Sequence, residues 1–243
     1  MSQNPTPSMK RFYKDADFAV VATEAGESGF QIRLDGRPVR TPNRAHLIVA
    51  HEPLAAAIVA EWASQGEEID PAAMPMTGLA NAAIDRVGPE RATFVRDIAA
   101  YATTDALCYR AEGPEPLVAR QAAAWDPMLH WAEDRYGVAF VLAQGVMPVE
   151  QPAMTLATLT RAVEGMGAWT LTAMAKLTHL TGSLVGPLAL VEGAVDADTL
   201  WTASIVDELW QEELWGADHW ADKHRADRRA DFMGAVRFLG LVA

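Results

Sequence analysis

The spacing of apolar residues changes once along the chain, near His51, and this change constrains the fold more than any other feature. Phe30–Leu34 alternates apolar and polar side chains, as a half-buried strand does. The following Asp35–Gly36 favours a tight hairpin turn, because glycine accepts positive φ angles. Beyond His51 the pattern is helical. The sequence therefore predicts an α+β fold, with a small β-rich N-terminal domain (residues 1–52) followed by a larger all-α C-terminal domain (residues 53–243).

Helices in the C-terminal part are predicted from apolar spacing and from residues typical of helix starts. Phe94, Ile98 and Tyr101 fall on one face of the first of these helices. Asp126–Pro127 indicates the start of another, because Asp caps helix N-termini and Pro suits the first helical position. Later helices are predicted over residues 154–165, 168–181 and 198–215, with a last one running to about residue 239.

The segment Glu61–Asp85 lies where the helical pattern begins. It starts as a helix end, crosses the acidic turn Gly66–Pro71 and enters a second helical run at Pro75, where a missing N–H is tolerated. It holds no metal-ligand pair, phosphate-binding loop or activated nucleophile. We therefore interpret the segment as structural, and predict that Glu61 and Asp85 orient the backbone at helix ends.

Short motifs occur in a fixed order over nearly the whole chain, and together they are more specific than any one alone. The longest reads EW-x-x-Q-x-x-x-I-x-P-x-x-MP-x-T-x-LA and occupies Glu61–Ala80. With it, the sequence resembles the ATP-twelve (ATP12) chaperone family. The remaining motifs that carry the resemblance are Arg11–Lys14, Leu34–Pro42, Tyr101–Asp105, Cys108–Arg110, Trp125–Pro127, Asp207–Gln211 and Trp215–Gly216.

This resemblance implies an assembly chaperone that binds the alpha subunit of the F-type ATP synthase catalytic head and prevents its aggregation before it pairs with beta. No Walker loop or serine-nucleophile motif is present, so we expect ATP-independent action, no catalytic residue, no cofactor and no small-molecule substrate. The first ten residues have neither an apolar segment nor the features of a transit peptide. In this family that suggests a bacterial, cytoplasmic member; eukaryotic relatives would be in the mitochondrial matrix.

Composition argues against other classes of partner. A formal charge of −12 disfavours nucleic acid and anionic membrane surfaces, both of which need a basic footprint. Cys108 is the one cysteine, so it forms no intramolecular disulfide and is expected to be a buried, inert thiol. The apolar stretch 168–195 is interrupted by Lys176 and His179. It therefore predicts buried helices, with no membrane insertion.

A crowded group of histidines and acids supports an alternative function, a metal-dependent hydrolase on a helical scaffold. The group consists of Asp218, His219, Asp222, His224 and Asp227. The two histidines are five residues apart, which directs them about 140° apart on a helix. No HExxH motif accompanies them. We therefore favour a solvated, charge-paired face and predict no metal site.

Asp105 is an acid on an otherwise apolar helical face. It could be a buried general base, but buried charges are usually paired. We therefore predict a structural ion pair, with Arg86 or Arg110 as the candidate partner.

The partner-binding site is predicted in the acidic and aromatic segment near the C-terminus. Glu208 and Glu212 form a like-charge pair on one helix, next to the face that carries Asp207, Gln211 and Trp215. Aromatic anchors and acids suit a partner surface that is apolar with a basic rim. Two further tryptophans, Trp201 and Trp210, are predicted to be core. The predicted partner-binding residues are Asp207, Glu208, Gln211, Glu212 and Trp215.

Overall fold

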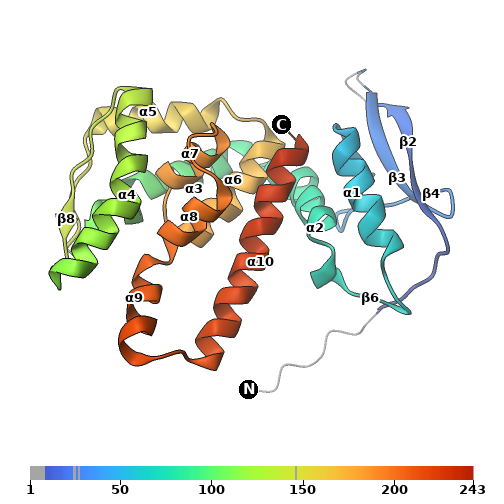
Figure 1. Ribbon diagram of the computed structural model, residues 1–243. Coiled ribbons are helices and arrows are strands. Elements are labelled where there is room, and N and C mark those ends of the chain that lie inside the picture. The colour runs from blue at the N-terminus through green and yellow to red at the C-terminus, as the bar shows by residue number, and fades with distance from the viewer. Residues whose placement is uncertain (1–8, 24–25, 27, 146, 243) are drawn as a thin grey trace. The chain divides into compact units, whose positions relative to one another are not determined.

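The computed structural model describes residues 9–23, 26, 28–145 and 147–242 (Figure 1). Most of its strands lie in the N-terminal region, one further pair of two-residue strands lies at Tyr109–Arg110 and Ala143–Gln144, and the rest is mainly helical, so the predicted α+β class is confirmed. Contacts group the chain into two units. Unit 1 comprises Met1–Glu90 with Arg237–Ala243, and unit 2 comprises Arg91–Val236. The first helices after residue 52 thus share unit 1 with the strands, whereas the sequence pattern divides the chain at residue 52.

Unit 1 is built around the predicted hairpin. Strands β2 (Ala16–Ala22) and β3 (Ser28–Leu34) pair antiparallel. The chain then turns through Asp35 and Gly36, whose φ angles of 48° and 74° match a hairpin turn. The short strands β4 (Arg37–Pro38) and β5 (Ile48–Val49) both pair antiparallel with β3. The turn at Asp35 and Gly36 thus sets the register of β4 against β3, in which Leu34 pairs with Arg37.

Helix α1 (Glu52–Ala63) packs against β2 and β3. Its Leu54 and Ile58 are fully buried, as is Ile32 of β3, so the first core forms between one helical face and one sheet face. The chain continues through β6 (Glu68–Ile69), which pairs with β1 (Met9–Lys10), and then through η1 (Pro71–Ala73), α2 (Pro75–Ala82) and η2 (Ala83–Val87).

Two acids of unit 1 hold backbone groups in place: Glu61 at a helix end, as predicted, and Asp85 at the loop that follows β4. The Glu61 carboxylate is buried and accepts hydrogen bonds from the backbone N–H of Met76 (2.6 Å) and of Thr77 (2.8 Å), in the first turn of α2. Asp85 accepts from the Thr41 hydroxyl (2.6 Å) and from the backbone N–H of Asn43 (2.9 Å). Both carboxylates therefore satisfy donors that would otherwise be unpaired.

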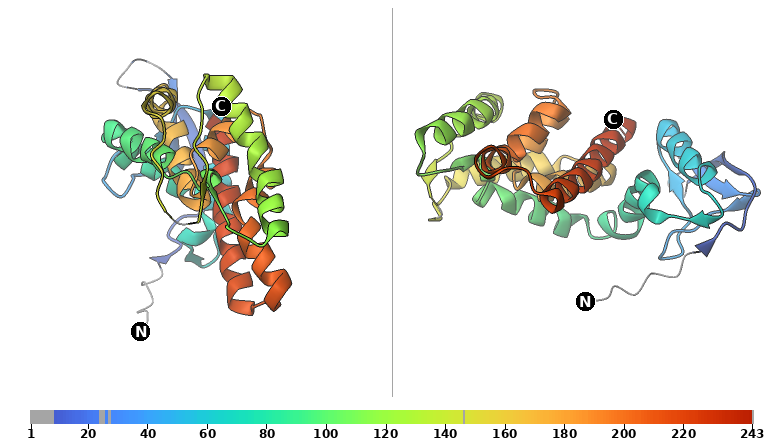
Figure 2. Two further views of the ribbon diagram at one scale, coloured as in Figure 1. Left: turned by 90° about the vertical axis from the view of Figure 1, so that its left-hand side faces the viewer. Right: turned by 60° about the horizontal axis from the view of Figure 1, so that its bottom comes forward.

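Unit 2 is a set of packed helices. Helix α4 contacts α7, α8 and α9, while α6 contacts α3 and α7, and α3 contacts α5 (Figure 2). Fully buried side chains such as Leu159, Met174 and Phe232 form the core of this unit. The elements are α3 (Arg91–Ala99), η3 (Ala100–Thr103), η4 (Ala106–Cys108), β7 (Tyr109–Arg110), α4 (Glu115–Tyr136), β8 (Ala143–Gln144), α5 (Ala153–Glu164), α6 (Ala168–Thr181), α7 (Val185–Val191), α8 (Ala197–Ser204), α9 (Val206–Trp215) and α10 (His219–Val242), whose residues from Arg237 onward belong to unit 1.

Two helix boundaries differ from the sequence prediction. Pro127 lies inside α4, so the predicted helix start at Asp126 is wrong. The Asp126 carboxylate instead accepts a hydrogen bond from Arg110, and the buried Trp125 and Met128 stabilise the helix on both sides of the proline. The helix predicted over 198–215 is broken at Ile205, whose φ and ψ of −118° and 17° are not helical. Burial of the Ile205 side chain accompanies this break.

The apolar stretch 168–195 forms two short helices, α6 and α7, separated by Gly182 in the left-handed region (φ 66°). Both helices are largely buried, as predicted. Within the described residues, no helix combines the length and the apolar character that crossing a membrane requires.

Candidate partner-binding site

The predicted site residues lie on α9, which forms a hairpin with the first half of α10 (Figure 1). Gly216, with a φ of 86°, ends α9 and lets the chain turn. Asp218 then accepts a hydrogen bond from the backbone N–H of Trp220 (2.8 Å), near the start of α10. We call Leu214–Trp220 the hairpin tip.

Arginines from α10 and α4 neutralise most of the acids on α9. Arg228 donates to Glu208 (2.6 Å), and Arg225 Nη2 lies 2.5 Å from Glu212 Oε2. Arg120 donates twice to Glu213, at 2.7 and 2.9 Å, and this bidentate contact lowers the pKa of the Glu213 carboxyl. The like-charge pair expected between Glu208 and Glu212 is therefore offset by cations from another helix. These three glutamates therefore link α9 to α4 and α10 through ion pairs and are also partly exposed to solvent.

Large apolar side chains at the hairpin tip are exposed. The exposed fraction is 78% for Trp215, 75% for Trp220 and 56% for Leu214. Trp201, by contrast, is buried against Phe232, as predicted for a core residue. Trp210 is only half-buried beneath the Arg120 guanidinium, so its assignment to the core was wrong in part. Exposed tryptophans grouped in this way are typical of contact surfaces.

Four of the five predicted residues border one hollow between α9 and α10, with a volume of about 440 Å³. They are Glu208, Gln211, Glu212 and Trp215. Asp207 does not line this hollow. Its carboxylate accepts a hydrogen bond from Gln121 Nε2 of α4 (2.7 Å), and it borders a different pocket together with Gln211. The structure thus divides the predicted residues between two neighbouring depressions that share Gln211.

Sequence reasoning missed three participants in this surface. They are Trp220, Arg225 and Arg228. A signal for the arginines was present, because both lie at helical spacing within an acidic neighbourhood. Their pairing with α9 depends on the hairpin, which local spacing does not specify.

The His and Asp residues of the alternative hypothesis are spread over this same hairpin. Asp218 accepts from the N–H of Trp220, and Asp222 pairs with Arg225 at 2.5 Å. Across the part of the chain that the structure describes, no three His, Cys, Asp or Glu side chains are grouped in a way that could hold a metal ion.

Asp105 and Cys108 are buried beside each other in unit 2. Asp105 accepts hydrogen bonds from the backbone N–H groups of Leu107 (3.1 Å), Leu184 (2.8 Å) and Val185 (2.9 Å). Burial raises the pKa of Asp105, and these backbone donors oppose that shift. Burial, followed by the nearby Asp105, raises the pKa of the Cys108 thiol to about 12, which fits the predicted inert thiol. The predicted ion pair of Asp105 with Arg110 is wrong, because Arg110 pairs with Asp126 and backbone N–H groups hold the Asp105 carboxylate.

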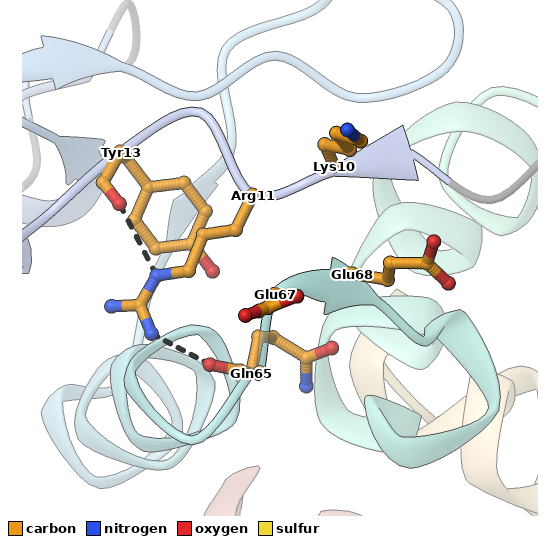
Figure 3. A pocket seen from close by; sticks show the side chains of 7 residues that line it. Lys10, Arg11, Tyr13, Gln65, Glu67 and Glu68 are labelled. Atoms are coloured by element: carbon orange, nitrogen blue, oxygen red, sulfur yellow. Dashed lines mark hydrogen bonds between the residues drawn. The ribbon is translucent and has the colours of Figure 1, made fainter.

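Unit 1 has a polar hollow of about 530 Å³ between β1 and the turn after α1 (Figure 3). Arg11 spans it, and its guanidinium donates to the backbone carbonyls of Tyr13 (3.2 Å), Lys14 (3.0 Å) and Gln65 (2.6 Å). The Tyr13 hydroxyl donates to the carbonyl of Trp62 (2.6 Å). Through these contacts the Arg11 guanidinium holds the chain next to β1 against the turn after α1. We therefore interpret this hollow as structural.

Comparison with known proteins identifies the family. A sequence model described as ATP12 chaperone protein matches residues 10–133. The chain belongs to the ATP12 chaperone family. It is similar to the crystal structure of Atp12 from Paracoccus denitrificans, with 38% identity, a TM-score of 0.89, and coverage of 96% of this chain and 98% of that one. It is also similar to a putative chaperone from Agrobacterium tumefaciens, with 38% identity, a TM-score of 0.90, and coverage of 98% and 87%. Membership of the ATP12 family supports chaperone function over the hydrolase alternative.

Proposed function

We propose that this ATP12-family protein is an ATP-independent assembly chaperone that binds the alpha subunit of the F-type ATP synthase catalytic head. In this proposal the α9–α10 hairpin contacts the alpha subunit and prevents its aggregation until beta pairs with it. The proposed compartment is the cytoplasm of a bacterium. Family membership supports the chaperone role, and the resemblance of the motifs supports the choice of partner.

The observation that carries the proposal is the exposure of Leu214, Trp215 and Trp220 at the hairpin tip. A free subunit awaiting its partner must keep its own apolar contact surface away from other chains. A protein that covers that surface needs apolar side chains that are not used by its own core. The tip provides three of them within seven residues.

Charge around the tip supports a partner with basic residues at its rim. Residues 207–222 include six acids and neither Lys nor Arg. Arg120 and Arg228 each neutralise one acid, Glu213 and Glu208, whereas Arg225 is shared by Glu212 and Asp222. The remaining negative charge therefore lies on Asp207, on Asp218 and on the Glu212–Asp222 pair. Such charges affect which partner is selected and how fast it associates more than they affect the Kd of the complex.

Replacement of Trp215 by alanine tests the proposal. The indole is mostly exposed, so the free energy of unfolding should change by less than about 0.5 kcal/mol. Loss of a central aromatic anchor typically weakens binding by about 2 kcal/mol or more, which corresponds to roughly a thirtyfold rise in Kd. Titration of purified alpha subunit by calorimetry, together with thermal unfolding of the variant, measures both quantities.

Met154→Ala is the matched control, because Met154 is a comparably exposed apolar residue on α5, away from the hairpin. It should bind alpha as the wild type does. Purified beta subunit should bind neither the wild type nor the variants. Wild-type affinity of Trp215→Ala for alpha would rule out the hairpin tip as the contact surface.

A further inference from the structure

Strand β2 of unit 1 is hydrogen-bonded along one edge only. It pairs with β3, and both β4 and β5 pair with the opposite edge of β3. The N–H of Asp35 donates to the carbonyl of Asp15 (2.9 Å), which fixes the alternation of the antiparallel ladder. The odd-numbered residues of β2 therefore bond to β3, and the even-numbered residues direct their backbone N–H and C=O groups to the outer edge. These outward residues are Ala16, Phe18, Val20 and Ala22.

The outer edge of β2 is open. Within the part of the chain that the structure describes, no hydrogen bond reaches the backbone N–H or C=O of Phe18 or Val20. Solvent reaches this edge, because Val20 is 64% exposed and Asp17 and Ala22 are exposed as well. A row of open backbone groups is a template on which another extended chain can pair.

β2 also lacks the features that protect exposed edges in other proteins. Edge strands are usually very short, or they carry Pro, Lys or a β-bulge. The strands at the opposite edge fit this rule, because β4 and β5 have two residues each and β4 contains Pro38. β2 has seven residues without Pro, Gly or Lys, and its continuous register against β3 excludes a bulge. Its one charged residue, Asp17, is held by Arg33 (2.8 Å) on the face opposite to Ile32.

Apolar side chains lie beside this open edge, on the face of the sheet that holds the buried Ile32. Phe18 pairs with Ile32 across the ladder, and Val20 is the next residue on the same face. The rings of Phe18 and Phe30 meet edge to face at 5.6 Å, and both are only half-buried. An added strand would cover this apolar surface with every second side chain and would place polar side chains beside Asp17.

We propose that the outer edge of β2 binds an extended, Pro-free segment of the client chain, which adds to the sheet as a further strand. The inference rests on the proposed function, because it takes the client to be the alpha subunit, and it gives unit 1 a client contact of its own. A second copy of this protein fits the edge less well, because two copies with a formal charge of −12 each repel one another. Strand addition relies on main-chain hydrogen bonds. It therefore suits a chaperone that holds a chain not yet assembled with its partner.

Proline at position 20 tests strand addition in the complex with alpha subunit. Val20→Pro removes an outward N–H and keeps the ladder with β3, so the melting temperature should stay close to that of the wild type. The Kd for alpha should rise at least about fivefold, because one backbone hydrogen bond to the client is lost and the ring obstructs its neighbours. Val20→Thr is the matched control, since it keeps the backbone donor and the β-branched shape, and it should bind alpha as the wild type does. Val21→Pro removes a donor to β3 and should lower the melting temperature.

Amide hydrogen exchange of the wild type tests the edge without a substitution, and it decides the matter even if Val20→Pro does not fold. In the free protein the amides of Phe18 and Val20 should exchange much faster than those of Ala19 and Val21, which bond to β3. Bound alpha subunit should slow the exchange of Phe18 and Val20 at least about tenfold.

A peptide probe tests the edge without the alpha subunit. A short acetylated peptide of alternating Val and Thr should slow the exchange of the Phe18 and Val20 amides. The same peptide with N-methylated Val residues, which cannot donate from those positions, should not. Should the wild type fail to bind alpha, the proposed function falls and the two peptides alone decide whether the edge accepts a strand.

Four results would overturn strand addition at β2. The first is equal alpha binding by folded Val20→Pro and Val20→Thr. The second is slow exchange of the Phe18 and Val20 amides in the free monomer, which would mean that the same chain covers the edge. The third is equal protection by the plain and the N-methylated peptide. The fourth is protection that grows with protein concentration alone, together with a dimer in sedimentation, which would assign the edge to a second copy.

Discussion

Two buried carboxylates in this protein, Glu61 and Asp105, accept hydrogen bonds from backbone N–H groups. Asp105 accepts three backbone hydrogen bonds, and the neighbouring Cys108 thiol is held in its protonated form by burial and by the charge of Asp105. Neither group faces the hairpin surface or the pocket beside it. A buried acid that accepts backbone hydrogen bonds in this way needs no opposing cation beside it.

Cys108 makes the stability of the fold sensitive to alkaline pH. Its pKa is about 12 in the folded protein and ordinarily near 9, so the thiol is protonated in both states below pH 9 and its contribution is fully present there. As pH rises from about 9 to 12, the unfolded chain releases the proton first. The free energy of unfolding should then fall by about 1.4 kcal/mol per pH unit from this group. Urea unfolding over this pH range, compared with Cys108→Ala, isolates the effect; equal pH slopes would contradict it.

At the scale of elements, the N-terminus of α2 depends on a side chain from α1. Glu61→Gln removes the charge at the helix N-terminus and directs an amide NH₂ toward backbone donors. We expect a loss of about 1–3 kcal/mol in the free energy of unfolding. Glu67→Gln, at an exposed position in the turn that follows α1, should change stability by less than about 0.5 kcal/mol. Urea midpoints compare the two, and equal midpoints would show that Glu61 does not stabilise α2.

Swapping the charges of the ion pair between Glu208 of α9 and Arg228 of α10 separates an effect on folding from an effect on binding. Glu208→Lys places a cation beside Arg228 and should lower stability by no more than about 1 kcal/mol, because both groups are partly exposed. Adding Arg228→Glu restores an ion pair of reversed polarity and should restore the unfolding midpoint. If the partner recognises the charge of Glu208, the double variant still binds alpha weakly. Full recovery of binding would show that Glu208 acts only by holding the hairpin together.

The sequence correctly predicted the features that depend on the conformational preferences of neighbouring residues. The turn at Asp35 and Gly36 and the helix start at Pro75 were visible because the residues themselves favour those conformations. The helix start predicted at Asp126–Pro127 was wrong because burial of Trp125 and Met128 outweighs the helix hydrogen bond that Pro127 cannot donate. That burial depends on helices distant in the sequence. The pairing of Glu208 with Arg228 was missed for the same reason. Asp207, Glu208 and Trp215 could be named from the sequence, but their arrangement around two separate depressions could not.

At the scale of the whole molecule, a formal charge of −12 accompanies an exposed aromatic tip. Like net charge keeps copies of the protein apart, which matters because their apolar tips could otherwise associate with one another. The pairing of the α9 acids with arginines lowers the local repulsion at the hairpin. The rest of the surface therefore provides most of the repulsion between copies.

The uncovered tip has a consequence for the amount of protein that a cell can maintain. Each copy without a partner presents two tryptophans and a leucine to every other protein it meets. A large excess of the chaperone would add exposed apolar surface to its compartment, and a shortage would leave its clients unprotected. We expect its synthesis to be kept in proportion to that of its client, so that most tips are covered.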